Sequence, residues 1–148
     1  MAILFGCGGG GGGNLTQQTG IVTQPTKAVV KLATSGALPT GKLIGGIEAT
    51  LTYAAGKGLS IGGSDAVASG VGSGSLLAAN TNTAGQVRLG LISTGIQTGE
   101  FATATFTIAA GNSPVAGDFA IASGANVIDT DSVAQPGITV GIQSVTFQ

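Results

Sequence analysis

Acidic residues are the side chains whose types and spacing could do chemistry in this sequence. Asp129 and Asp131 are separated by one residue, and together with Asp118 they could supply the oxygen ligands that Ca²⁺ prefers. Two acids in such close succession are also common in solvated turns, and that interpretation is favoured. Glu48 and Glu100 could form the carboxylate pair of a glycoside hydrolase. Each lies on or beside an expected strand without nearby polar residues, so solvent-facing positions are favoured and no catalytic residue is predicted.

The remaining residue types exclude several classes of chemistry. The sequence has no histidine, which excludes Ser-His-Asp and Cys-His nucleophiles and histidine-based zinc sites. The single cysteine, Cys7, cannot form an internal disulfide. The glycines of residues 6–13 have phosphate-loop spacing, but no Lys-Ser or Lys-Thr pair follows them. The five basic residues are scattered, so we expect no nucleic-acid partner. Since no motif for a cofactor or a metal is recognised, we expect neither of these to be bound.

The composition fits one globular domain with a weakly charged surface. The chain has 148 residues, of which 43% are hydrophobic and only 7% are charged, against a usual charged share of about 25%. The solvent-facing residues must therefore be mostly Thr, Ser, Gln, Asn, Gly and Ala. With a formal net charge of −1, little electrostatic repulsion holds neighbouring molecules apart. No apolar run approaches the ~18 residues of a membrane-spanning helix.

Hydrophobic and polar residues alternate in short segments from Thr26 onward. In residues 47–53, Ile, Ala, Leu and Tyr occupy one face and Glu and two Thr residues the other. Similar alternation occurs in residues 27–33, 86–92, 101–108 and 138–142, followed by Val145 and Phe147. Such alternation between Gly-, Ser-, Asn- and Pro-rich turns predicts half-buried antiparallel strands. Residues 64–79 fit either a short helix or a loop. The predicted fold is all-β: an antiparallel, jelly-roll-like β-sandwich of seven to nine strands.

The first 25 residues differ from the rest and are predicted to form a separate segment. Six consecutive glycines, Gly8–Gly13, offer no side chains to pack and have maximal backbone freedom. The residues that follow are largely polar, with Ile21 and Val22 as their one adjacent apolar pair, and Pro25 marks an edge. The predicted organisation is a Gly-rich tether or assembly segment over residues 1–25 and a β-sandwich over residues 26–148.

Three of the expected strands resemble, in order and spacing, strands of the cohesin family of β-sandwich modules. They are GIEATLTY at residues 46–53, GQVRLGL at residues 85–91 and GEFATATF at residues 99–106. The likeness covers residues 26–148, although cohesins usually have Asp-Pro where this sequence has Ala54-Ala55. The resemblance implies a sandwich of the carbohydrate-binding/cohesin type in a secreted or surface protein without enzymatic activity.

Residues 4–7, Leu-Phe-Gly-Cys, resemble the lipobox of bacterial lipoproteins. That pattern has Leu, a small residue, then Gly or Ala before the lipidated cysteine. The resemblance implies that Cys7 carries a membrane anchor and that the following glycines form a flexible tether. Phe5 departs from the pattern, and the stretch before Cys7 is too short for a signal peptide, so this interpretation requires a start upstream of Met1. The alternative is a free cysteine beside a Gly-rich tail.

Two hypotheses about function remain, and neither involves catalysis. In the first, the protein is a structural subunit of an extracellular filament, in which a segment within Thr16–Ala33 adds a strand to an open sheet edge of the next copy. The predicted subunit contacts are Ile21, Val22, Val29, Val30 and Leu32. In the second, it is a lipid-anchored, cohesin-like adhesion or scaffolding module that binds a protein partner through one sheet face. Both place the protein outside the cell or at the cell surface.

Overall fold

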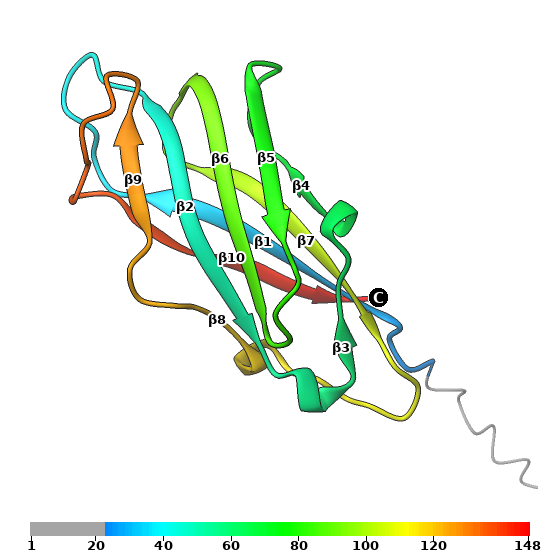
Figure 1. The fold of residues 1–148 in the computed structure, drawn as a ribbon. Helices are drawn as coiled ribbons and strands as arrows, with labels where there is room; N and C mark the ends of the chain where they lie inside the picture. Colours follow the sequence, from blue (N-terminus) through cyan, green and yellow to red (C-terminus); the bar gives the residue numbers. More distant parts are fainter. Residues whose placement is uncertain (1–22) are drawn as a thin grey trace, which may run out of the picture.

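The structure, a computed structural model, describes residues 23–148 and consists of β-strands joined by turns (Figure 1). These residues form ten strands and three 3₁₀ turns, and no α-helix. No helical turn among them is long and apolar enough to cross a membrane. The strands are β1 (Lys27–Ser35), β2 (Ile44–Tyr53), β3 (Leu59–Ser60), β4 (Ala66–Ala68), β5 (Ser75–Asn80), β6 (Gln86–Ile96), β7 (Glu100–Ile108), β8 (Phe119–Ile121), β9 (Asn126–Asp129) and β10 (Thr139–Phe147). The turns are η1 (Ala55–Lys57), η2 (Gly63–Asp65) and η3 (Ala116–Asp118).

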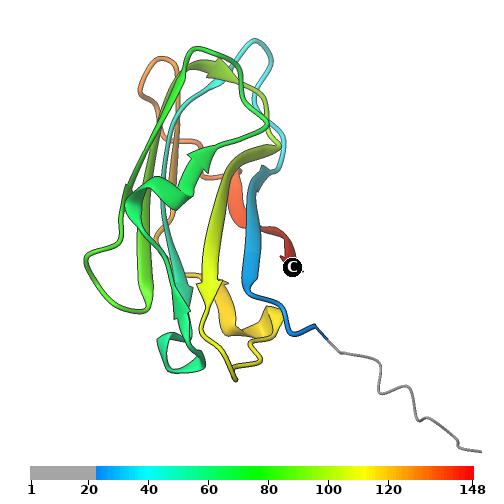
Figure 2. The ribbon, with the colours of Figure 1, turned by 90° about the vertical axis from the view of Figure 1, so that its right-hand side faces the viewer.

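The strands form two antiparallel sheets that pack face to face as a β-sandwich (Figures 1 and 2). Sheet A has the order β10-β1-β7, with β3 and β4 following one another along the outer edge of β7. Sheet B has the order β5-β6-β2, with β8 and β9 along the outer edge of β2. The predicted all-β sandwich is confirmed. The described residues form ten strands where seven to nine were predicted. The additional strands are among β3, β4 and β8, which are each only two or three residues long.

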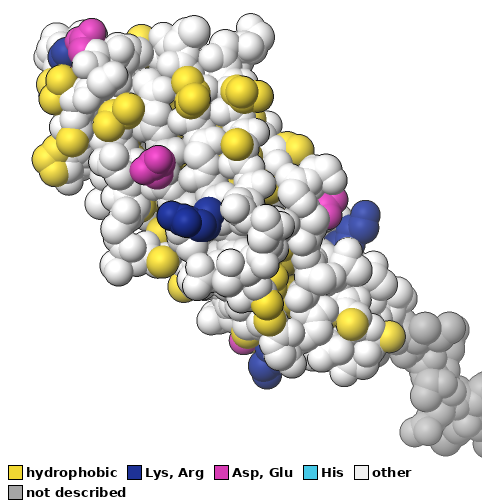
Figure 3. Space-filling view, viewed as in Figure 1, with side chains coloured by type: hydrophobic (Ala, Val, Ile, Leu, Met, Phe, Trp, Pro, Cys, Tyr) yellow, Lys and Arg dark blue, Asp and Glu magenta, His cyan; other side chains and the backbone are white. Residues whose placement is uncertain are grey.

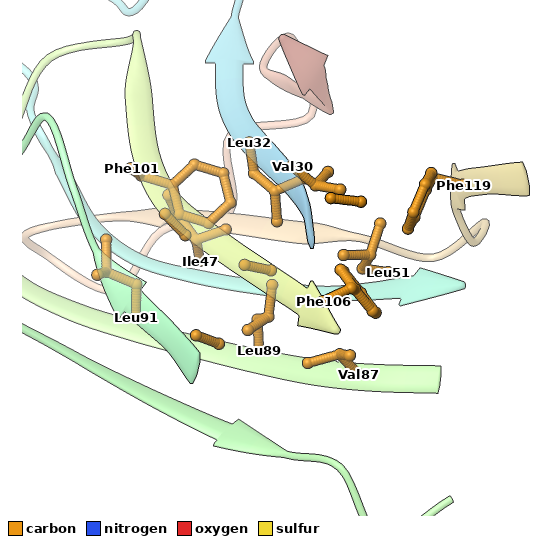
Figure 4. Packing of buried hydrophobic residues seen from close by; sticks show 14 of the residues in the cluster. Val30, Leu32, Ile47, Leu51, Val87, Leu89, Leu91, Phe101, Phe106 and Phe119 are labelled. Atoms are coloured by element: carbon orange, nitrogen blue, oxygen red, sulfur yellow. The ribbon is translucent and has the colours of Figure 1, made fainter. Parts of the chain in front are cut away.

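Alternating residues of the central strands fill the space between the sheets (Figure 4). In β1, Ala28, Val30 and Leu32 are completely buried, as their alternation predicts. The other strands contribute Ile47, Leu51, Val87, Leu89, Leu91, Phe101, Ala104, Phe106, Phe119 and Val127. Each large aliphatic or aromatic side chain buried in this way stabilises the fold by about 1.5–3 kcal/mol. The core therefore holds both sheets together through residues most of whose positions the sequence pattern indicates, with Phe101 as an exception.

Two β-bulges explain where the strict alternation of the sequence fails. In β10 the pairing with β1 shifts by one residue at Gln143. Ile142 and Val145, which are three positions apart, consequently both lie opposite buried residues of β1. In β7 a similar shift inserts Phe101 as an extra residue, and both Phe101 and Ala102 are buried. The bulges thus keep apolar residues on the core face on both sides of a break in the pattern.

Residues 64–79, for which the sequence left helix and loop open, contain β4 and most of β5. Gly70 lies in the connection between these two strands and has a φ of 69°. This left-handed conformation favours glycine, since a Cβ would crowd the backbone there. The glycines that argue against a helix in this stretch therefore serve a turn between strands.

Candidate functional site

The outward face of sheet B carries a row of apolar residues that crosses β5, β6, β2 and β9. Every second residue of these strands points into the core, and the residues between them face outward. Leu76 of β5 pairs with Ile92 of β6. Gly46 of β2 pairs with Ile92 on one side and with Ile128 of β9 on the other. These four residues, here called the apolar row, therefore lie side by side across the whole width of the sheet.

The apolar row is exposed at its β5–β6 end and covered at its β9 end. Leu76 and Ile92 are each 70% exposed, more than any other large hydrophobic side chain of the described residues. Ile128 instead leans over Gly46, where a Cβ would lie only 2.9 Å from its Cγ1 atom. Two neighbouring, exposed aliphatic side chains form a patch of the kind that marks interaction sites on soluble proteins.

Next to the apolar row, small residues form the floor of a groove. Ala78 of β5 pairs with Gly90 of β6, and Gly90 pairs with Glu48 of β2. A Cβ at Gly90 would meet no atom within 4 Å, so the floor is open above this residue. Two hollows, of about 620 and 400 Å³, adjoin here and share these three residues. The larger extends along the apolar row, and the smaller extends toward Arg88 and Asn80.

The groove has one charged side chain of each sign near its centre. Glu48 and Arg88 are both exposed, on adjacent strands of the outer face. Within the described part of the chain, neither takes part in a salt bridge. In the space-filling view, one acidic and one basic side chain lie in the middle of this face, with hydrophobic side chains toward its upper end (Figure 3). The two charges are therefore free to pair with groups on a bound molecule.

A buried carboxylate fixes the loop that ends β9, beside the apolar row. Asp129 Oδ1 accepts hydrogen bonds from the backbone N–H groups of Asp131 and Val133, both at 2.9 Å. Its Oδ2 accepts one from Gln135 Nε2 at 3.0 Å and lies 3.4 Å from Lys42 Nζ. The pKa of Asp129 is lowered, mainly by the hydrogen bond from the Val133 N–H, whereas burial acts in the opposite direction and raises it. Hydrogen bonding to Asp131, then to Asp129, raises the pKa of Lys42.

The calcium site considered for Asp118, Asp129 and Asp131 is not assembled. Asp129 lies beside the start of β2, opposite Ile44, whereas Asp118 immediately precedes β8, which pairs with the end of β2. Ile44 and Tyr53 lie nine residue steps apart along β2, so the two ends of this strand, and the two aspartates beside them, are about 30 Å apart. The ammonium group of Lys42 lies against both Asp129 and Asp131. In residues 23–148 no three acidic or cysteine side chains come together as a metal site.

Glu48 and Glu100 do not form a catalytic pair, because they lie on different sheets. Glu48 faces outward from sheet B, and Glu100 lies on β7 of sheet A. Glu100 forms an ion pair with Lys31 Nζ at 3.0 Å. Two hydrogen bonds lower the pKa of Glu100. The one from Ser69 has the larger effect, and the one from Lys31 comes second. Glu48 is exposed, as the sequence favours, whereas the Glu100 side chain is only 19% exposed and is held by Lys31, so the two carboxylates share no site.

The predicted subunit contacts divide into two groups. Cys7, Ile21 and Val22 lie outside the described residues. Val29, Val30 and Leu32 belong to β1, which pairs with β10 on one side and β7 on the other. Val30 and Leu32 are fully buried in the core of their own chain, and Val29 is half-buried on the outer face of sheet A. Because both edges of β1 are occupied, this strand cannot be donated to a neighbour while it keeps its place.

The groove itself was not predicted from the sequence, although two signals pointed toward it. Ile92 follows the core residue Leu91 directly and so breaks the apolar–polar alternation of β6. The adjacent leucines Leu76 and Leu77 likewise break the alternation of β5, where only Leu77 packs against the core. A second apolar residue beside a core residue in a strand places hydrophobic surface on the outer face.

Comparison with known proteins supports the cohesin-like fold. No protein-family model matches the sequence, and no curated protein matches it. A non-cellulosomal cohesin from the hyperthermophilic archaeon Archaeoglobus fulgidus is similar in structure, with a TM-score of 0.56 and 18% identity over 75% of this chain and 73% of that chain. A cohesin module from a Clostridium perfringens family 33 glycoside hydrolase gives a TM-score of 0.49 and 10% identity, over 85% and 95% of the two chains. The likeness to the archaeal cohesin confirms, at the level of the fold, the resemblance noted in three strand motifs.

Proposed function

We propose that this protein is a non-catalytic, protein-binding module of the cell surface or extracellular space, and that its partner binds in the groove of sheet B. Support for a protein partner comes from the cohesin-like fold, because cohesins are protein-binding modules. A fold does not by itself define a function, so the proposal depends on the chemistry of the groove.

The observation that carries the proposal is the exposure of Leu76 and Ile92, at 70% each, beside an open groove. Covering a large aliphatic side chain contributes about 1.5–3 kcal/mol. A partner that covers both side chains would gain a desolvated centre of the kind that dominates protein interfaces. The small residues Gly90 and Ala78 leave room beside this pair for an apolar side chain of the partner.

The polar residues of the groove indicate how a partner would be oriented. Glu48 and Arg88 carry opposite charges, and the other lining residues are neutral apart from the buried Asp129. Paired charges at an interface fix orientation more than they add affinity. The expected partner is therefore a protein surface with an apolar protrusion and a balanced charge, bound with little dependence on salt concentration.

The test compares a groove variant with a matched variant on the opposite sheet. Ile92→Asp places a carboxylate in the apolar row, and Val67→Asp makes the same change at a half-exposed valine of β4 in sheet A. Immobilised wild-type and variant proteins are exposed to the extracellular and surface proteins of the source organism. Captured proteins are quantified by mass spectrometry, and the affinity of each purified candidate is then measured by calorimetry.

We expect one captured protein to bind the wild type and the Val67→Asp variant equally and the Ile92→Asp variant at least tenfold more weakly. Gly90→Leu, which fills the floor of the groove, is expected to weaken the same interaction. Thermal unfolding of each variant shows whether the sandwich is intact. If every captured protein binds the Ile92→Asp and Val67→Asp variants equally well, the groove is not the binding site and the proposal is wrong.

A further inference from the structure

We propose that the outer edge of β10 accepts residues Thr16–Val22 of a second copy as an additional strand, so that copies join head to tail. This contact uses a strand edge of sheet A and not the groove of sheet B. It therefore goes beyond the proposed function and does not depend on it.

Among the described residues, β10 is the one long strand whose outer edge no other strand pairs with, although the short strand β8 of sheet B lies close to β10. β3, β4 and β8 are two or three residues long, and β9 is followed by a chain that returns to it through a bridge between Ile128 and Ala134. The edge of β5 lies beside η2, where a Cβ at Gly63 would be 3.6 Å from the Ala79 carbonyl oxygen. β10 has nine residues, and among the described residues it pairs with β1 alone.

The register of β10 shows which backbone groups its open edge presents. Gln148 and Lys27 donate to each other's carbonyl oxygens, both at 2.9 Å. In an antiparallel ladder such pairs alternate, so Thr146 also faces β1, while the N–H and C=O groups of Val145 and Phe147 point away from it. These groups could form the ladder hydrogen bonds of a further strand.

The side chains of β10 do little to prevent such pairing. Natural sheets usually protect an exposed edge with lysine, proline, a bulge or a short strand. β10 contains no charged residue and no proline, and no charged residue follows Asp131 in the sequence. Of the four features named above, β10 has only the bulge at Gln143. The regular part of the edge is therefore Ser144–Phe147, at the C-terminal end of the strand.

The N-terminal part of the chain leaves the sandwich at this same end. The N–H of Thr26 donates to the carbonyl oxygen of Gln148 at 2.6 Å. Thr23 and Gln24 are exposed, and the described residues before β1 lead away from the sandwich and past the end of β10 (Figures 1 and 2). Because residues 23–26 do not turn back along β10 of their own chain, they leave its outer edge open to a second copy.

The composition and length of the preceding residues suit the role of a donated strand. No charged side chain occurs before Lys27, so none would be desolvated on pairing with the uncharged edge. Thr16–Val22 would span about 23 Å when extended, enough to cover the regular part of the edge. It ends in Ile21 and Val22, which could extend the apolar faces of sheet A.

The contact differs on the two subunits, because one gives a segment and the other gives an edge. Such a head-to-tail contact forms a closed ring if the rotation between subunits brings the last copy back to the first. In all other cases it continues as a fibre. The low net charge of −1 offers little repulsion against stacking many copies.

The test uses full-length variants that each remove one half of the contact. Val145→Pro removes an outward N–H group of β10, and Val145→Ala is its matched control, which shortens the same side chain but keeps the N–H. Ile21→Asp with Val22→Asp puts two charges into the donated segment. Gly9→Asp with Gly10→Asp adds the same charges outside it. Mass is measured by light scattering over a concentration series, and particles are imaged by electron microscopy.

We expect the wild type and both control variants to form chains that lengthen with concentration. Val145→Pro and the Ile21→Asp/Val22→Asp variant are each expected to associate at least tenfold more weakly. Mixed together, these two variants should form heterodimers and nothing longer, because one keeps its segment and the other keeps its edge.

Other results would overturn the proposal. A wild-type protein that stays monomeric at every concentration has no such contact. A donor-segment variant that assembles as well as its glycine control shows that another surface joins the copies. If thermal unfolding shows that Val145→Pro does not fold, the comparison of Ile21→Asp/Val22→Asp with Gly9→Asp/Gly10→Asp still tests the proposal. These substitutions lie outside the sandwich core.

Discussion

Alanine substitutions at two glycines of sheet B should change stability in opposite directions. Gly45 and Gly90 both lie in long central strands of this sheet, β2 and β6. Neither has a positive φ, so the backbone conformation of both suits alanine. The difference between them lies in the space around the missing Cβ atom.

At Gly90 the new methyl group would meet no atom within 4 Å. Replacing glycine by alanine where no clash occurs typically stabilises a protein by about 0.4–1 kcal/mol, because the unfolded chain loses conformational freedom. At Gly45 the Cβ would lie 2.7 Å from the carbonyl oxygen of Asp129 and 2.8 Å from Thr130 Cα. Both are backbone atoms of a loop held by the buried Asp129 carboxylate, so the expected cost is that of overpacking, about 1–3 kcal/mol.

The two variants should therefore differ in unfolding free energy by about 1.4–4 kcal/mol. Equilibrium urea unfolding measures this difference, provided that the dependence on urea stays the same in both variants. Gly117→Ala, in η3, is the control, because its Cβ would also meet nothing within 4 Å. A Gly45→Ala variant as stable as the wild type would refute the reasoning, and so would a Gly90→Ala variant that is less stable.

Three further predictions concern the core and the Asp129 loop. Phe106→Ala should lower the unfolding free energy by about 3–5 kcal/mol in the same assay, because its ring lies 4.9 and 5.1 Å from two neighbouring aromatic rings. Folding lowers the pKa of Asp129 through the N–H of Val133 and through Lys42, so its stabilisation is present above about pH 4 and is lost as the pH falls further. Urea titrations between pH 7 and 3 should therefore show a smaller acid loss in Asp129→Asn than in the wild type. Excess CaCl₂ should leave the melting temperature unchanged, because Lys42 already pairs with the loop carboxylates; a rise specific to Ca²⁺ would contradict this.

The alternation of residue types was sufficient to predict the sandwich and most of its core. In β1 and β7 the buried residues Val30, Leu32, Ala104 and Phe106 are those that period-2 alternation places on one face. This succeeds because side chains of a strand point to opposite faces in turn, whatever the strand pairs with. The sequence also favoured solvent-facing positions for Glu48 and Glu100, because each lies on or beside a strand without nearby polar residues.

The partners of each strand could not be obtained in this way, because alternation carries no information about neighbours. The position of β1 between β10 and β7, which leaves neither of its edges free, depends on which strands pair. The insertion of Gln143 and Phe101 as bulges depends on register. Without that register, two apolar residues three positions apart cannot be assigned to the same face.

The groove, the open edge of β10 and the Asp129 loop were likewise decided by tertiary structure alone. Leu76, Ile92 and Ile128 come from three separate strands, and only their pairing brings them into one row with Gly46. Lys42 reaches Asp129 from 87 positions away in the sequence, where local spacing favoured a solvated turn and left a bound cation as the alternative. Local sequence therefore determined what each segment is, and long-range pairing determined which segments share a site, because contacts between distant residues are set by the energy of the whole fold.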